Sequence, residues 1–262
     1  MNNLKGRVAL VTGSSRGIGA AIARRLALEG AAVIVHYNAQ RGPAESLVSE
    51  IGYARAVGAD LGSPSGPAEL VRAAFEWKGA LDIVVNNAGA LTVGAVDALD
   101  ADAIDRMLAV NVRAVILTTR EFAAVTQSRA GRVINISSIA GSMPNGGASV
   151  YAATKAAVDS LTRSHATELG SRGITVNAVA PGPTETDMYS ALPAETKGIV
   201  TRTMPLGRMG RPDDIAPVVA FLASDDAQWV TGQVIAASGG AITTSVNVMR
   251  IVTAARALPD PN

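Results

Sequence analysis

Short runs of β-branched and aliphatic residues alternate along the chain with longer, alanine-rich stretches of helical period. Near-continuous apolar runs are typical of strands buried on both faces of a sheet. We expect strands at Arg7–Thr12, Ala32–His36, Ala54–Val57, Leu81–Val85, Arg132–Ile136, Ile174–Val179 and Gln233–Ala237. The stretches between them predict helices at Gly17–Glu29, Pro43–Ile51, a segment ending at Trp77, Asp102–Thr126 and Ser149–Leu169. This alternation predicts a parallel sheet covered by helices on both faces.

No linker or internal repeat divides the pattern, so residues 1–240 are expected to form one doubly wound α/β domain with a seven-stranded sheet. Between Pro181 and Asp214, Gly, Pro and Thr interrupt any periodicity. A long loop in a compact domain often binds a ligand, and we expect a substrate loop at about 183–214. Residues 241–262 form a C-terminal extension. We expect it to pack on a neighbouring subunit or to shape the pocket, with a frayed polar end as the alternative.

Composition excludes several classes of protein. Of the 262 residues, 48% are apolar and 17% are charged, and the formal net charge is +1. The chain therefore lacks both the composition of a disordered protein and the basic surplus of a nucleic-acid binder. With no cysteine and two histidines, disulfides and thiolate or histidine-rich metal sites are excluded. No apolar run reaches the roughly 18 residues of a membrane span, and no apolar signal region is present at the start. We expect a cytoplasmic protein with neither nucleic-acid nor membrane partners.

A glycine-rich segment, Thr12-Gly-Ser-Ser-Arg-Gly-Ile-Gly19, joins the first expected strand to the first expected helix. Glycines here let the backbone turn tightly and approach a pyrophosphate, whose charge the helix N-terminus favours. Because strand, turn and helix follow in the required order, the segment predicts a dinucleotide-binding site. The alternative is a tight turn without a ligand.

The end of the second strand distinguishes NAD from NADP. A chain that binds NAD usually carries Asp or Glu there to bind the ribose 2′-hydroxyl. This chain has His36-Tyr-Asn38, and its next carboxylate is Glu45. Arg16 in the glycine turn and Arg41 after the strand offer positive charge for a 2′-phosphate. NADP is therefore favoured over NAD, and the alternative for Arg16 is a solvated surface charge.

Four polar residues form the expected catalytic group. Tyr151 and Lys155 are four residues apart in an expected helix and share one face of it. Ser138 follows the fifth strand, at the strand ends that face the ligand crevice of open α/β sheets. Asn111 lies in the preceding long helix. Each residue alone has a structural explanation, but the four together predict a catalytic site.

The order and spacing of these motifs resemble the short-chain dehydrogenase/reductase family. The resemblance covers residues 5 to 240, and its matching pieces are Thr12–Gly19, Asn86–Gly89, Asn111, Ser138, Tyr151, Lys155 and Pro181–Gly182. It implies a single-domain Rossmann fold and an NADP-dependent oxidoreductase, which transfers a hydride between the nicotinamide and a carbonyl or secondary alcohol. The alternative of another class is a dinucleotide-binding protein without turnover, because a fold does not fix a function.

The resemblance also implies a role for each catalytic residue. In reduction, Tyr151 would donate its proton to the carbonyl oxygen, and Ser138 would hydrogen-bond the same oxygen. Lys155 would favour the tyrosinate and hold the nicotinamide ribose hydroxyls. Asn111 would position a water molecule in the proton relay.

Contacts with the cofactor are implied at several strand ends. Asp60 and Leu61 would hold the adenine ring, although an Asp also caps turns well. The full set expected to bind the cofactor is Gly13, Ser15, Arg16, Gly17, Ile18, Gly19, His36, Tyr37, Asn38, Asp60, Leu61, Asn87, Ala88, Gly89, Tyr151, Lys155, Pro181, Gly182, Thr184 and Thr186.

The substrate is less constrained by the sequence. The pocket is expected to be lined by Ser138, Met143, Tyr151, Met188 and Tyr189, with further apolar candidates at Leu91, Val93, Val150, Leu192 and Met204. These residues are mainly apolar, with no Arg or Lys placed to bind a carboxylate. A neutral or weakly polar ketone therefore fits better than a small keto acid.

Within the family, the chain looks most like the 3-oxoacyl-acyl-carrier-protein reductases, which predicts a 3-oxoacyl thioester as substrate. Arg129 and Arg172 match the basic positions with which those enzymes dock the acidic carrier protein, and solvated loop charges are the alternative. The competing hypothesis is a stand-alone ketone reductase or secondary alcohol dehydrogenase of specialised metabolism. Relatives are commonly homotetramers, and we expect the same assembly here.

Overall fold

The computed structural model describes residues 3–143, 146–190 and 193–243. They contain one parallel seven-stranded sheet in the order β3-β2-β1-β4-β5-β6-β7, so the predicted doubly wound α/β class is confirmed. The strands are β1 (Val8–Val11), β2 (Ala32–Tyr37), β3 (Ala54–Gly58), β4 (Ile83–Asn86), β5 (Arg132–Ile136), β6 (Thr175–Pro181) and β7 (Val234–Ala237).

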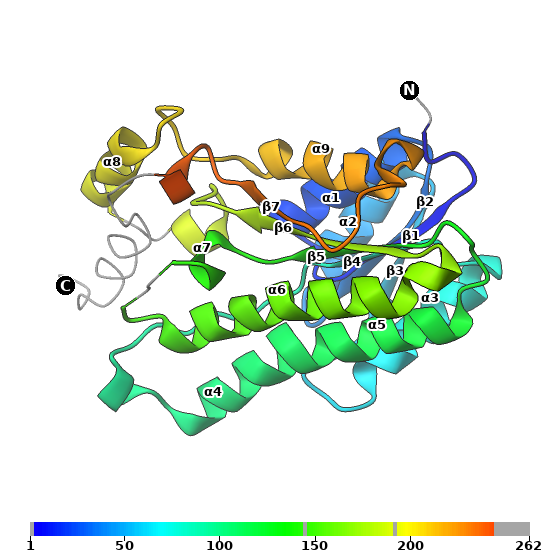
Figure 1. Ribbon diagram of the computed structural model, residues 1–262, viewed down its shortest axis with the longest axis horizontal. Coiled ribbons are helices and arrows are strands. Elements are labelled where there is room, and N and C mark those ends of the chain that lie inside the picture. The colour runs from blue at the N-terminus through cyan, green and yellow to red at the C-terminus, as the bar shows by residue number, and fades with distance from the viewer. Residues whose placement is uncertain (1–2, 144–145, 191–192, 244–262) are drawn as a thin grey trace.

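Helices cover both faces of the sheet (Figure 1). One face carries α1 (Gly17–Leu28), α2 (Arg41–Ile51) and α9 (Pro212–Ala223). The opposite face carries α3 (Gly66–Lys78), α4 (Ala101–Leu108), α5 (Ala114–Val125) and α6 (Ser149–Leu169). Two short helices, α7 (Asp187–Ser190) and α8 (Ala194–Thr203), lie together beyond one end of the sheet.

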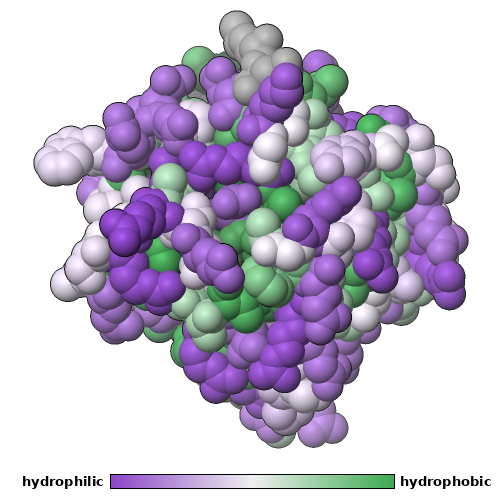
Figure 2. All heavy atoms as spheres, turned by 90° about the vertical axis from the view of Figure 1, so that its right-hand side faces the viewer, coloured by the Kyte–Doolittle hydropathy of each residue, from purple (hydrophilic) through white to green (hydrophobic). Residues whose placement is uncertain are grey.

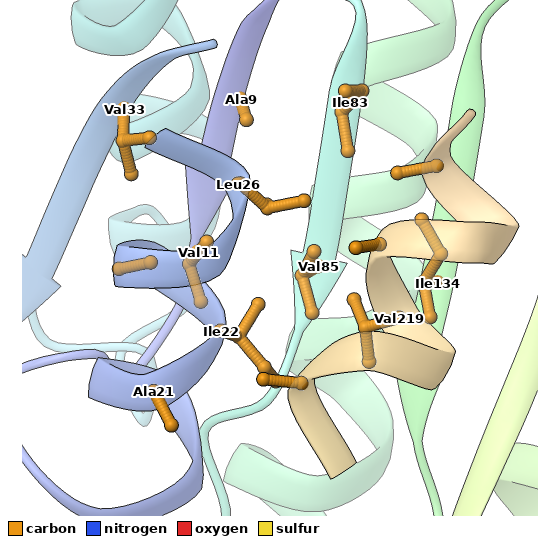
Figure 3. Close-up of a cluster of buried hydrophobic side chains, with 14 of the residues drawn as sticks. Ala9, Val11, Ala21, Ile22, Leu26, Val33, Ile83, Val85, Ile134 and Val219 are labelled. Carbon is orange, nitrogen blue, oxygen red and sulfur yellow. The ribbon is translucent and has the colours of Figure 1, made fainter. Parts of the chain in front are cut away.

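Each face of the sheet has its own apolar core. Figure 3 shows Val11 and Val85 of the strands pointing toward Ile22 of α1 and Val219 of α9. On the other face, alternate strand residues such as Leu10 pack with α3, α5 and α6. Because both faces of the central strands are buried, these strands are apolar at nearly every position instead of alternating with polar residues.

The direction of winding reverses between β1 and β4. From β1 the chain proceeds to β2 and β3 on one side, whereas β4 to β7 follow on the other. Crossovers on opposite faces leave a crevice at the carboxyl ends of the strands, where open α/β sheets bind ligands. This topology brings the segments after β1, β4, β5 and β6 to one edge of the sheet.

The long helix predicted at Asp102–Thr126 is present as one helical stretch from Ala101 to Val125, but it is not α-helical throughout. A π-turn at Ala109–Arg113 separates α4 from α5, and Asn111 lies inside it. The hydrogen bonds of such a turn span five residues instead of the four of an α-helix, and these turns are frequent at functional sites. The sequence did not reveal this turn, because a single π-helical turn leaves the surrounding apolar pattern like that of an ordinary helix.

The region predicted as irregular, from Pro181 to Asp214, contains α7 and α8. The sequence reading also missed α9, which contains Pro217 in its interior. Proline normally ends or kinks a helix because it has no N–H group. The sequence does indicate the start of α9, because proline is common at the first position of a helix and Pro212 stands there. In the structure, the Asp214 carboxylate accepts the Arg211 N–H at 2.6 Å.

Within the described part of the chain, no helix is both long and apolar enough to cross a membrane. Figure 2 shows the side of the molecule that lies to the right in Figure 1, away from α7 and α8, where hydrophilic residues are interspersed with small hydrophobic patches.

Candidate active site

The glycine turn after β1 lies very close to the end of β4. Gly13 has a φ of +62°, and a Cβ atom on it would lie 2.9 Å from the Ala88 Cα. A Cβ atom on Gly19 would lie 2.5 Å from both the Asn87 Nδ2 and the Gly13 carbonyl oxygen. Both contacts are too short for any side chain, so glycine is required at these two positions.

Side-chain hydrogen bonds connect the turn to β4. The Thr12 Oγ1 accepts the backbone N–H groups of Asn87 and Ala88, both at 2.9 Å. In return, the Asn87 Nδ2 donates to the carbonyl oxygens of Thr12 and Gly13 at 2.8 and 3.0 Å. These bonds fix the glycine turn against the next strand before any ligand binds.

His36 at the end of β2 supports the same turn. Its Nδ1 accepts the Gly13 N–H at 2.8 Å, and its Nε2 lies 3.0 Å from the Ala59 carbonyl oxygen. These partners require a neutral ring protonated at Nε2, and burial lowers the pKa of His36 accordingly. The ring borders the cleft, but both of its nitrogens are already bonded to the backbone.

Replacing Gly19 by Ala tests how tightly this turn is packed. We expect Gly19→Ala to lower the free energy of unfolding by about 1–3 kcal/mol, since the new methyl group meets backbone and a fixed amide. Gly42→Ala is the matched control, because a Cβ at Gly42 in α2 meets nothing within 4 Å. Denaturant unfolding of both variants checks the prediction, and an equally stable Gly19→Ala protein would show that the turn is loosely packed.

A cleft of about 510 Å³ runs along the carboxyl edge of the sheet. Every residue predicted to bind the cofactor lines it, from Gly13 in the glycine turn to Thr186 after β6. Ser138, Tyr151 and Lys155 line it as well. Asp60 also caps a turn, because its Oδ1 accepts the Gly62 N–H at 2.9 Å.

Tyr151 and Lys155 occupy adjacent turns of α6. The Lys155 Nζ donates to the Ile136 carbonyl oxygen at 2.8 Å and lies 5.6 Å from the centre of the Tyr151 ring. Burial lowers the pKa of Lys155 to about 8, opposed by the charge of Asp159 one turn further along. The amine is thus a poorly solvated cation placed beside the tyrosine.

Ser138 follows β5 and is buried beside these two residues. Its Oγ accepts the Ala140 N–H at 3.2 Å, at the start of a short 3-10 turn, Ile139–Gly141. This bond engages an acceptor lone pair and leaves the hydroxyl hydrogen available as a donor. A carbonyl oxygen in the cleft is a suitable acceptor for it.

Asn111 lies behind the cleft instead of on its surface. Its Nδ2 donates to the Ala90 carbonyl oxygen at 2.8 Å and to the Thr154 Oγ1 at 3.1 Å, and its Oδ1 accepts the Ala90 N–H at 2.7 Å. The side chain therefore connects the segment after β4 to α6, between Tyr151 and Lys155. This placement keeps the π-turn in contact with the helix that carries the candidate catalytic pair.

The two arginines considered for the 2′-phosphate differ in position. Arg16 lines the cleft and pairs with Asp187, with 3.0 Å between its Nη1 and the Asp187 Oδ2. Arg41 is instead paired with Glu45 on α2 at 2.7 Å and is absent from the cleft lining. Of the two, only Arg16 borders the proposed cofactor site.

The predicted substrate residues also differ in position. Tyr189 is buried and lines the cleft, as do Leu91 and Val93. Met143 and Met204 pack in an apolar cluster beside it and are not among the lining residues. Three of the predicted features lie outside the described residues: the Met188 side chain, the whole of Leu192, and residues 244–262 of the predicted extension.

Sequence reasoning missed several residues at this edge. Asp187, Arg106 and Val110 line the cleft, and Thr154 holds Asn111. Two of them could have been found from the sequence, because Val110 is the neighbour of Asn111 and Thr154 lies between Tyr151 and Lys155. No sequence pattern pairs Arg16 with Asp187, which are separated by 171 positions.

The arrangement fits a dinucleotide. A Cβ on Gly89 would lie 3.6 Å from the Asn111 Oδ1 and 3.8 Å from the Lys155 Nζ, so the missing side chain leaves room beside the amine. An ammonium has three N–H donors, and among the described residues Lys155 Nζ has one hydrogen bond, to Ile136. Ribose hydroxyls in the cleft are suitable acceptors for the others.

Comparison with known proteins agrees with this geometry. A family model described as enoyl-(acyl carrier protein) reductase matches residues 13–242. An uncharacterised oxidoreductase of Methylorubrum extorquens is 44% identical over 248 residues, covering 92% of this chain and 99% of that protein. The hydroxynaphthalene reductase-like protein Arp2 of Metarhizium guizhouense is 41% identical over 262 residues, covering 92% and 97%.

Solved structures show the same fold. A short-chain dehydrogenase from Burkholderia cenocepacia in complex with NADP has a TM-score of 0.88 and 41% identity, covering 92% of this chain and 99% of that one. The angucycline C-6 ketoreductase LanV with bound NADP has a TM-score of 0.87 and 38% identity, covering 92% and 98%. Together with the site geometry, these matches show that the chain belongs to the short-chain dehydrogenase/reductase family of oxidoreductases.

Proposed function

We propose that this protein reduces a ketone to a secondary alcohol with NADPH. The observation that carries the proposal is one continuous cleft, which joins the glycine turn to Tyr151 and buried Lys155. A dinucleotide held by the turn would extend along the strand ends toward these two side chains. A dinucleotide-binding protein without turnover has no need of this pair.

NADPH is preferred over NADH on the basis of charge. The end of β2 carries His36, Tyr37 and Asn38, none of which repels a 2′-phosphate, and Arg16 borders the same cleft. Two solved relatives, from Burkholderia cenocepacia and LanV, contain NADP. Residues of the glycine turn would hold the pyrophosphate, and Lys155 would hold the nicotinamide ribose.

The chain's own residues would manage the proton and the developing charge. When bound, the nicotinamide supplies the hydride. Tyr151 holds its proton on the phenol oxygen and donates it to the ketone oxygen, and the Lys155 ammonium stabilises the tyrosinate left behind. Ser138 donates a hydrogen bond to the same ketone oxygen as negative charge develops on it. Asn111 holds the segment after β4 against α6 through its hydrogen bonds to Ala90 and Thr154.

For the substrate, we propose a neutral ketone attached to an apolar body. Apolar and aromatic residues that line the same cleft as Tyr151 include Leu91, Val93, Ala148 and Tyr189, which suit a hydrophobic ligand. Two relatives have names that refer to cyclic aromatic compounds, the hydroxynaphthalene reductase-like protein and the angucycline ketoreductase. A bicyclic aromatic ketone is therefore the first candidate.

A 3-oxoacyl thioester, delivered by an acyl carrier protein, is the second candidate. Arg129 and Arg172 border one polar hollow together with Gln127 and Ser128, which would suit an acidic partner. They precede β5 and β6, at the amino edge of the sheet, whereas the cleft lies at the carboxyl edge. A docked carrier would have to reach around the sheet or into another copy of the chain, which favours the free ketone.

The test compares two ketones and two cofactors. With NADPH as cofactor, we expect faster turnover of 1-tetralone than of an acetoacetyl thioester. With 1-tetralone as ketone, we expect NADPH to be oxidised about tenfold or more faster than NADH, because charged hydrogen bonds hold the 2′-phosphate. Faster turnover of the thioester would favour the acyl reductase. Faster turnover with NADH would contradict the proposed role of Arg16.

We further propose that the protein is a homotetramer. In each subunit, residues 1–240 would form the cofactor-binding and catalytic domain, and residues 241–262 the C-terminal extension. Exposed apolar side chains support the assembly. Trp229, before β7, is 96% exposed, and Phe221 of α9 is 43% exposed. Large apolar side chains that gather into one exposed patch are typical of surfaces that associate. A cytoplasmic location stays a prediction.

A further inference from the structure

The ion pair between Arg16 and Asp187 joins two separate parts of the cleft. Arg16 belongs to the glycine turn, before α1, and Asp187 is the first residue of α7. Their charged groups are 3.0 Å apart, and both residues line the cleft. The proposed function uses Arg16 but gives no role to Asp187.

A second contact fixes the distance between these segments. A Cβ atom on Gly17 would lie 3.6 Å from the Thr186 Cγ2, so Thr186 packs directly on the glycine turn. Thr186 precedes Asp187 in the chain, and its Oγ1 donates to the Thr184 carbonyl oxygen at 3.4 Å. The backbone beside Asp187 is therefore held next to Arg16 by more than the ion pair.

The geometry of the pair leaves most of the guanidinium available. Between the two side chains, the Arg16 Nη1 donates one hydrogen bond to the Asp187 Oδ2, whereas a guanidinium has five N–H donors in a rigid planar fork. A phosphate binds such a fork best through two parallel hydrogen bonds. A carboxylate that holds one corner of the fork limits its rotation and leaves other donors for an anion.

We propose that Asp187 is a positioning residue for the cofactor's 2′-phosphate. It holds the Arg16 guanidinium at the edge of the cleft, so that the remaining N–H groups bind the phosphate with less loss of side-chain freedom. This inference rests on the proposed use of NADPH. It adds a specificity-determining residue on the segment after β6, remote in sequence from the glycine turn and β2.

The expected effect is moderate in size. Arg16 and Asp187 are 67% and 70% exposed, and exposed ion pairs couple weakly and are screened by salt. Loss of the Asp187 charge should weaken binding of a 2′-phosphate by about 2- to 5-fold. Loss of Arg16 itself should have a larger effect, because the phosphate then loses its cation.

The test uses cofactor fragments, so that its readout does not depend on turnover. Calorimetry measures the Kd of 2′,5′-ADP and of 5′-AMP for the wild type, Asp187→Asn and the matched control Glu185→Gln. Glu185 is a 61% exposed acid on the same segment that does not line the cleft. We expect Asp187→Asn to weaken 2′,5′-ADP by about 2- to 5-fold, with 5′-AMP and the control unchanged.

Combining the change with Arg16→Ala shows whether Asp187 acts through Arg16. In that background Asp187→Asn should have no further effect on 2′,5′-ADP binding. The proposal is overturned if Asp187→Asn leaves binding unchanged, if it tightens binding because Asp187 competes for Arg16, or if its effect persists without Arg16.

The fragments also separate this inference from the proposed function. If the wild type binds 2′,5′-ADP more tightly than 5′-AMP and Asp187→Asn has the same Kd values, Asp187 has no role in phosphate binding but the proposed use of NADPH stands. A wild type without any preference contradicts both. The expected fragment pattern without reduction of either ketone would support Asp187 and contradict the proposed reaction.

Discussion

Replacing Tyr151 by Phe is expected to lower kcat for NADPH-dependent ketone reduction by roughly 10²–10⁴-fold, the usual contribution of a positioned general acid. The change removes one oxygen atom and keeps the ring that lies 5.6 Å from the Lys155 Nζ. Without the phenol, the ketone oxygen has no proton donor in the place where Lys155 can stabilise the anion. Steady-state kinetics with saturating NADPH measures the loss.

The control for this variant is cofactor binding. Because the glycine turn and Lys155 are unchanged, Tyr151→Phe should still bind NADPH, with a Kd that changes far less than kcat, and should keep a folded structure. Turnover within a few-fold of wild type would show that another group donates the proton. A simultaneous loss of NADPH binding would instead indicate damage to the cleft.

The second large effect is expected from Lys155→Met. Its amine is buried, and burial lowers its pKa to about 8. The methionine has a similar length but can neither stabilise a tyrosinate nor bind ribose hydroxyls. We expect kcat/KM to fall by more than about 100-fold. Thermal stability should change little, because a hydrogen bond to Ile136 is lost but a poorly solvated charge is also removed.

The pH dependence of the wild type gives an independent check on Lys155. Burial disfavours the charged amine, so the ammonium is present below pH 8 and is lost as the pH rises through about 8. Reduction that needs the ammonium should therefore decline above that pH. The residual activity of Lys155→Met should lack this decline, and an identical profile in both proteins would contradict the assignment.

Much of the fold could be predicted because it depends on local chemistry. The apolar strand segments and the helix at Ser149–Leu169 follow from short-range patterns, and the structure has that helix at the same residues. The parallel topology then places strand ends at one edge, which is why Ser138, Tyr151 and the glycine turn line one cleft. These residues were identifiable because their neighbours in sequence already determine their position.

The features that were missed depend on contacts between distant segments. Pro217 conceals α9, whose stability comes from packing of residues such as Val219 against α1 and the sheet. His36 was expected to contact the cofactor, but no local pattern reveals that its ring bonds Gly13 and Ala59. The pairing of Arg16 with Asp187 likewise exists only after β6 has brought α7 beside the glycine turn.

The most direct test of the central claim is to measure NADPH consumption and alcohol formation together, in wild type and Tyr151→Phe, with 1-tetralone as the ketone. We predict that the wild type forms one alcohol molecule for each NADPH oxidised. The variant should bind NADPH but form alcohol at a rate far below that of the wild type. Alcohol formation that is equal in the two proteins, or NADPH binding without any ketone reduced by the wild type, would contradict it.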